Sequence, residues 1–212
     1  MRDDSSIMRE LADGVRAVRR TLTDRWDQVD EWFQREIARP GMREEIRAHL
    51  ARLSPERRAA VAARSRETTT HFAWCLFDEP EDPFSFWLHE YKPQRDWRPG
   101  YADSVHNHRY HFCTTVLGGA YEHERYDVAV DRKTGLITSA TLRTSVRCPA
   151  GTAGYLLADD FHRIPRASDD TLTFLIKSRP VNDWSLSYDP PTGTSHRHVP
   201  VERRMGALLD RL

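Results

Sequence analysis

The spacing of apolar residues divides the chain into two parts that meet near residue 70. Before that point apolar side chains recur every three or four residues, the period of an amphipathic helix. The apolar stripes run from Ile7 to Leu22, from Val29 to Ile37 and from Met42 to Leu50. Pro40-Gly41 interrupts this pattern, and Ser54-Pro55 is typical of an N-cap followed by proline in the first turn of a further helix. The pattern predicts three or four helices over residues 1–66.

After residue 70 the pattern changes to short segments with strand character, separated by turn residues. Strands are expected at 84–88, 110–117, 120–130, 136–146, 155–157, 161–164 and 171–177. Gly118-Gly119 and the segment 131–135 supply turns, and no helical pattern lies between the strands. A parallel α/β fold is therefore disfavoured, and an antiparallel sandwich or barrel is predicted.

The same pattern gives the expected domain organisation. A helical extension is predicted over residues 1–67 and a β-barrel over residues 68–190. Residues 191–212 are predicted to form a C-terminal tail that ends in a short helix over Val201–Leu212. The segment before that helix, Pro190 to Gly193, has the composition of a loop.

Charge and composition then limit the partners. The chain has 212 residues, with 32 Lys and Arg against 32 Asp and Glu, so its formal net charge is zero. A neutral chain is a poor candidate for nucleic-acid binding, which needs excess positive charge. No apolar run reaches the roughly 18 residues of a membrane span, the acidic N-terminus does not resemble a signal peptide, and three cysteines do not form a disulfide framework. A cytoplasmic protein is expected, a monomer or homodimer that acts on small molecules.

The histidines carry the most informative motif. His106 and His108 are two residues apart, so on a strand their imidazoles would share one face and could converge on one metal ion. A third ligand must come from elsewhere in the chain. His162, at the start of a later predicted strand, is the natural candidate.

These residues resemble a known sequence motif. Gly100, His106, His108 and Gly118 are spaced as in the first motif of the cupins, although Phe112 and Cys113 stand where that motif has a glutamate. Residues 149–162 resemble the second cupin motif, which supplies the distal histidine. The resemblance implies a cupin barrel, a double-stranded β-helix of the jelly-roll type, with a three-histidine metal centre.

Within the cupins, residues 84–180 resemble the thiol dioxygenases, such as the cysteine dioxygenases. That resemblance implies that Cys113 lines the pocket, although a free cysteine in a strand is also a common small core residue. Lys177 stands where the family has a tyrosine, and residues 71–76 lack the arginine that holds the substrate carboxylate. These differences favour a small metabolite other than cysteine. Cys75 and Cys148 are expected in the core.

Three imidazoles without a carboxylate give a site of charge +2 when Fe(II) binds, with open positions for O2 and an anionic substrate atom. The predicted function is therefore a mononuclear non-haem Fe(II) oxygenase that uses O2 and a small molecule. Zn, Ni, Cu and Mn remain alternative metals. Two other functions stay open: an isomerase, lyase or cyclase that uses the ion as a Lewis acid, and a cupin that binds a ligand without turnover.

Further candidates surround this motif. Arg163, Lys177, Arg109 and Arg125 are possible clamps for a substrate anion, with Arg163 and Lys177 preferred for their places near the third histidine and on the following strand. Lys177 is also a candidate catalytic residue. Tyr110 is expected either to pack in the core or to contact substrate.

The other histidines are assigned less direct roles. His123 either supports a metal ligand from outside or has a core or solvated position. His111 is expected to be structural. His196 and His198 form a second His-x-His that follows the predicted loop without a supporting strand pattern, and they are not expected to form the main metal site.

Overall fold

The computed structural model describes residues 7–18, 26–200, 204–205 and 208–211. Four helices open the chain: α1 (Ile7–Ala17), α2 (Trp26–Glu36), α3 (Met42–Arg52) and α4 (Pro55–Arg64). They agree with the predicted apolar stripes, except that the first stripe's continuation to Leu22 lies outside the described residues, as does part of the helix expected over 201–212. Among the described residues, no helix has the length and apolar character needed to cross a membrane.

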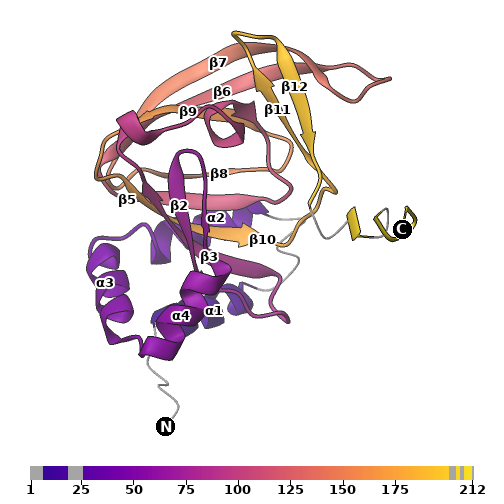
Figure 1. The fold of residues 1–212 in the computed structure, drawn as a ribbon. Coiled ribbons are helices and arrows are strands. Elements are labelled where there is room, and N and C mark those ends of the chain that lie inside the picture. Colours follow the sequence, from indigo (N-terminus) through magenta and orange to yellow (C-terminus); the bar gives the residue numbers. More distant parts are fainter. Residues whose placement is uncertain (1–6, 19–25, 201–203, 206–207, 212) are drawn as a thin grey trace.

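The rest of the chain forms two six-stranded antiparallel sheets (Figure 1). In spatial order, sheet 1 contains β1 (Arg66–Glu67), β2 (His71–Phe77), β3 (Phe84–Tyr91), β10 (Leu172–Ser178), β5 (Phe112–Gly118) and β8 (Ala153–Leu156). Sheet 2 contains β12 (Thr194–His198), β11 (Ser185–Asp189), β4 (Val105–His106), β9 (Phe161–Ala167), β6 (Ala120–Val130) and β7 (Ile137–Pro149). Two short 3-10 helices, η1 (Gln94–Asp96) and η2 (Tyr101–Asp103), lie between β3 and β4.

The order in which the chain passes between the two sheets identifies the type of fold. From β3 to β11 the chain passes repeatedly from one sheet to the other, so that strands distant in sequence become neighbours, such as β5 beside β10 and β4 beside β9. This alternation is the double-stranded β-helix of jelly-roll proteins. The predicted fold class, a mainly β barrel of the double-stranded β-helix type with N-terminal helices, is confirmed.

Because successive side chains of a strand point to opposite faces, the two faces of sheet 1 have different surroundings. On β10, Phe174 and Ile176 are fully buried in a core that also contains helical residues such as Val29 and Phe33. Their neighbours on the strand, Leu175 among them, face the space between the sheets. The helices therefore cover the outer face of sheet 1, while the inner face is left for the site (Figure 1).

Several strands, β1, β2, β11 and β12 among them, were not predicted from the sequence. The segment 71–77 forms β2, which pairs with β3, although no strand was expected there. Residues 185–189 form β11, and β12 at 194–198 pairs with it along its whole length. The expectation of an irregular segment at 194–198 is wrong, because the Pro190 to Gly193 loop is the turn of a hairpin that continues sheet 2 beyond residue 190.

Candidate metal centre

His106 and His162 are placed opposite each other by strand pairing. His106 ends β4, His162 is the second residue of β9, and the two are direct partners in sheet 2. Both side chains point into the space between the sheets, and both residues are buried. The His106 Nδ1–H donates a 2.8 Å hydrogen bond to the carbonyl oxygen of Ser104. That bond leaves Nε2 of His106 without a proton, which is the form that binds a metal.

His108 reaches the same point from a loop. Strand β4 ends at His106, so the expectation that both histidines lie on one strand is wrong. The loop is held instead by Asn107, whose side-chain oxygen accepts a 2.7 Å hydrogen bond from the backbone N–H of Leu186. The hydroxyl of Tyr101 donates to the carbonyl oxygen of Asn107. These contacts turn the chain so that His108 faces the other two histidines.

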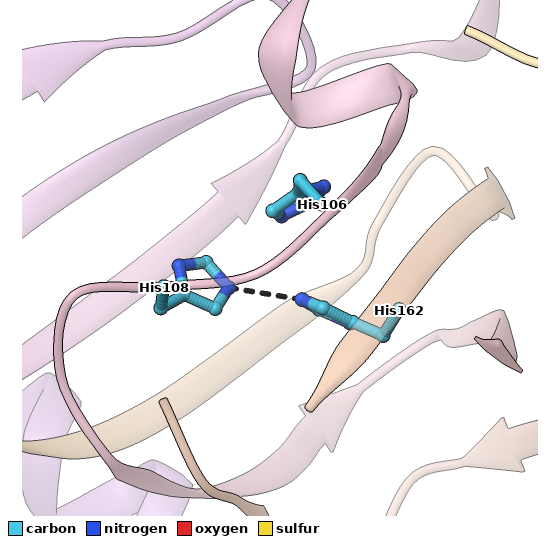
Figure 2. A group of neighbouring side chains, drawn as sticks. All are labelled: His106, His108 and His162. Carbon is cyan, nitrogen blue, oxygen red and sulfur yellow. Dashed lines mark hydrogen bonds between the residues drawn. The ribbon is translucent and has the colours of Figure 1, made fainter. Parts of the chain in front are cut away.

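The three imidazoles converge (Figure 2). Nε2 of His108 lies 2.9 Å from Nε2 of His162, and one ring nitrogen from each of the three residues lies within 4.8 Å of the others. Two nitrogens bound about 2.1 Å from one ion, at about 90° to each other, would be about 3.0 Å apart. The donor set therefore fits one transition-metal ion, and the predicted grouping of His106, His108 and His162 is confirmed.

A fourth histidine supports this group from outside. Nε2 of His123, on β6, shares a 3.1 Å hydrogen bond with Nδ1 of His162. A bond at Nδ1 fixes the ring and directs Nε2 toward the metal position. Of the two roles considered for His123 from the sequence, the supporting one agrees with this contact.

Burial keeps these rings neutral. Loss of solvation lowers the pKa of His106 and of His123 to about 4 each, from the ordinary value of 6.5. It also lowers the pKa values of His108 and His162 well below 6.5, and the neighbouring histidines add to the effect. Neutral imidazole is the ligand form, so the group is prepared to bind a cation near neutral pH.

Two chambers adjoin at His106 and His108, and His162 lines the inner one. The inner chamber, with a volume of about 60 Å³, extends toward an apolar wall that includes Phe112, Leu156 and Leu175. The outer chamber, with a volume of about 460 Å³, is lined mostly by residues with polar or charged side chains. His106 and His108 line both chambers, so a metal held there would be accessible from either side.

The outer chamber contains three of the residues singled out from the sequence. Lys177, Arg109 and Tyr110 all line it, and the ring of Tyr110 stacks on His108 with 5.1 Å between their centroids. Lys177 is 3% exposed and shares its strand face with Leu175. The chamber thus places basic side chains close to the metal position.

Two predicted site residues lie elsewhere. Cys113 is fully buried on the helix side of sheet 1, because Phe112 takes the inward position and successive strand residues face opposite ways. Its expected place in the pocket is therefore a wrong prediction. Arg163 follows His162 and faces away for the same reason. Its Nε donates a 2.7 Å hydrogen bond to the carbonyl oxygen of Asp103, and it lines a separate groove.

The remaining predicted residues have structural contacts. Arg125 donates a 2.8 Å hydrogen bond to the carbonyl oxygen of Tyr155, away from the chambers. Nδ1 of His111 accepts a 2.9 Å bond from the backbone N–H of Ala158, which agrees with a structural role. Nε2 of His198 bonds to the Ser187 hydroxyl at 2.7 Å.

Sequence reasoning missed two histidines of the site. His71 and His89 line both chambers and stack on each other with 4.3 Å between ring centroids. His71 belongs to β2, which was not predicted, and His89 lies beyond the predicted end of the strand 84–88. An extended alternation, with Trp87, His89 and Tyr91 on one face, is the signal that would have placed His89 in the interior.

Comparison with known proteins gives likenesses at low identity. No protein-family model matches the chain, and no curated protein matches it in sequence. Among solved structures, DMSP lyase DddQ from Ruegeria pomeroyi is 13% identical with a TM-score of 0.41, over 68% of this chain and 66% of that one. Oxalate decarboxylase from Bacillus subtilis is 15% identical with a TM-score of 0.38, over 57% and 28%.

The 7S globulin of Momordica charantia is 13% identical, with a TM-score of 0.40, over 64% of this chain and 35% of that one. The chain thus spans about a third of the globulin and just over a quarter of the decarboxylase. None of these likenesses assigns a family or an activity to this chain.

Proposed function

We propose that the protein is a mononuclear non-haem Fe(II) oxygenase that acts on a small anionic molecule. The observation that carries this proposal is the convergence of three neutral imidazoles, two of them buried and that of His108 half-buried, where two chambers adjoin. The described residues that line the inner chamber include no Asp or Glu, so a bound Fe(II) would keep its charge of +2. Such a centre attracts an anionic substrate atom and leaves open positions for a second ligand.

The iron would supply electron transfer to O2, and the chain's own residues would prepare the site for it. The Ser104 carbonyl and His123 hold two of the imidazoles in the orientation that ligation requires. The apolar wall of the inner chamber excludes water, and its volume of about 60 Å³ suits a molecule as small as O2.

The outer chamber would receive the organic substrate. Its volume of about 460 Å³ accommodates a small metabolite, and Arg66 and Arg109 line it. A guanidinium binds a carboxylate through two parallel N–H donors. These arginines would therefore orient an anionic group while another atom of the substrate faces His106 and His108.

Oxygen consumption tests this proposal. The Fe(II)-loaded protein would be placed in an oxygen-electrode cell with thiols and small carboxylic acids, one at a time. We expect substrate-dependent O2 uptake that disappears in His162→Ala and persists in His196→Ala, a control at an exposed strand position. Substrate conversion at the same rate without O2 would contradict the oxygenase proposal.

A second function is favoured by one observation. Tyr110 and Lys177, both able to transfer protons, lie in the outer chamber beside the histidines. This arrangement suits an isomerase, lyase or cyclase in which the ion acts as a Lewis acid and a side chain moves the proton. Conversion of substrate under strict anaerobiosis would identify that chemistry.

A further inference from the structure

The chain has three lysines, and they have very different surroundings. Lys133 is exposed in the turn between β6 and β7. The Lys92 ammonium is buried but donates to the Glu67 carboxylate and, at 2.7 Å, to the carbonyl oxygen of Thr68. Lys177 is also buried, at 3% exposed, but among the described residues it has neither kind of partner. Its role must be explained differently from that of an ion-paired lysine.

Aromatic rings surround the Lys177 amine. Nζ lies 4.3 Å from the centroid of Trp87, 5.2 Å from that of Tyr110 and 3.3 Å from Nε2 of His89. Within the described part of the chain, no carboxylate forms an ion pair or hydrogen bond with it. Glu67 lines the same chamber, but its carboxylate is engaged by Lys92 and Arg98.

This setting favours the uncharged amine. Loss of solvation lowers the pKa of Lys177 well below its ordinary value of 10.5, and the nearby Arg66 guanidinium lowers it further. Burial beside another cation is the usual means by which a protein converts a lysine into a nucleophile. The amine also lines the outer chamber, so a small molecule bound there can reach it.

We propose that Lys177 is a nucleophile that forms an imine with a small carbonyl compound, of the 2-oxo acid class, bound in the outer chamber. We infer the carbonyl group of this substrate from the buried amine, which has no carboxylate partner among the described residues and is therefore suited to attack a carbonyl carbon. The acid group follows from Arg66 and Arg109, which line the same chamber. The inference goes beyond the proposed oxygenase activity, because imine formation requires no metal.

The reaction balances without an oxidant or reductant. The Nζ lone pair attacks the carbonyl carbon, a nitrogen–carbon bond forms, and the carbonyl oxygen takes a proton to give a carbinolamine. Loss of the hydroxyl as water then leaves the carbon–nitrogen double bond. His89 is placed to accept the proton that nitrogen releases and to return it to the departing hydroxyl. Burial lowers the pKa of His89 well below 6.5, so the ring is a neutral acceptor.

Reductive trapping tests the proposal on the full chain without metal. The protein would be incubated with pyruvate and cyanoborohydride near neutral pH, and adducts would be located by peptide mass mapping. We expect a single adduct on Lys177, formed at least about tenfold faster than any on Lys133, because each unit by which a pKa falls raises the neutral fraction about tenfold. Adducts spread evenly over the three lysines would overturn the proposal.

Variants and a neutral probe sharpen the result. Lys177→Arg is expected to lose the adduct and Lys133→Arg to keep it, with both proteins checked by thermal unfolding. Site mapping in the unmodified chain remains decisive if Lys177→Arg does not fold. Methyl pyruvate, which lacks the charge, is expected to label Lys177 more slowly, and equal rates would overturn the carboxylate assignment. Because no metal is present, failure here leaves the oxygen-uptake test unaffected.

Discussion

Two of the three rings in the histidine group are held at Nδ1 by a contact that also decides their chemistry. His106 donates from Nδ1 to a backbone carbonyl, and His162 is bonded at Nδ1 by His123. In both cases the nitrogen that remains, Nε2, is the one available for a metal. The residues outside the group therefore determine which tautomer the group adopts.

His123 gives the first prediction. Replacing it with Leu removes the hydrogen-bond partner of His162 Nδ1 and leaves an apolar side chain of similar size in its place. We expect metal affinity to fall by about 10- to 100-fold, the usual cost of losing such a partner. Competition with a chelator of known affinity would measure it, with His196→Leu on an exposed strand position as the control. Unchanged affinity in His123→Leu would show that the hydrogen bond does not support ligation.

Stability should depend on pH through the buried histidines. The pKa of His106 is about 4 in the folded protein and about 6.5 when unfolded, so the unfolded state binds the proton first as the pH falls. Stability is therefore fully present above about pH 6.5 and is lost between about 6.5 and 4, by roughly 3 kcal/mol for His106 alone. Urea unfolding of the metal-free protein at pH 7.5 and 5 would measure this. A free energy of unfolding that rises toward pH 5 would contradict it.

At the scale of elements, strand alternation separates the chemistry from the packing. On β5, Phe112 faces the inner chamber while Cys113 faces the helices. On β10, Leu175 and Lys177 face the chambers while Ile176 lies in the helix-covered core. One strand thus contributes to both the site and the core.

The neighbours on β5 give a matched pair of variants. Cys113→Ala deletes one buried atom from the core between sheet 1 and the helices, so we expect a loss of about 1 kcal/mol of stability and no change in metal affinity. Phe112→Leu alters the wall of the inner chamber and is expected to change the spectrum or affinity of a bound metal. Denaturant unfolding and metal titration of both variants would check this. The reverse pattern would place Cys113 in the site after all.

Patterns in the sequence predicted those elements that can be recognised from residues close together in the chain. The helical stripes and the strand over 120–130 follow from periodicity, and His106, His108 and His162 follow from spacing. Whether the side chain of Cys113 faces the pocket or the helices depends on strand register, because a shift of one residue turns every side chain of a strand to the opposite face. His71 and His89 stack across the pairing of β2 with β3, and β3 takes its place in the sheet beside β10, a strand far along the chain.

At the scale of the whole molecule, the helices and sheet 1 share one core. Fully buried Phe33 of α2 and Ile37, which directly follows that helix, belong to the same cluster as Phe84, Phe86 and Phe174 of the sheet. The N-terminal helices were predicted as an extension of the barrel. The shared cluster indicates that they complete its hydrophobic core.

This arrangement predicts a single unfolding transition. Phe33→Ala should lower the free energy of unfolding by about 3–5 kcal/mol, since it empties a large buried volume. Circular dichroism, which follows the helices, and near-ultraviolet signals from the barrel tryptophans should lose structure together. Two separate transitions would show that the helices and barrel fold independently.

The central claim is that His106, His108 and His162 bind one transition-metal ion, and metal content tests it most directly. The protein would be purified without added metal, reconstituted with Fe(II), and analysed by inductively coupled plasma mass spectrometry beside His106→Ala and His162→Ala. We predict about one equivalent of metal per chain in the parent protein and a large loss in both variants. Less than about 0.1 equivalent in the parent protein, unaffected by the substitutions and not restored by Fe(II), would contradict the claim.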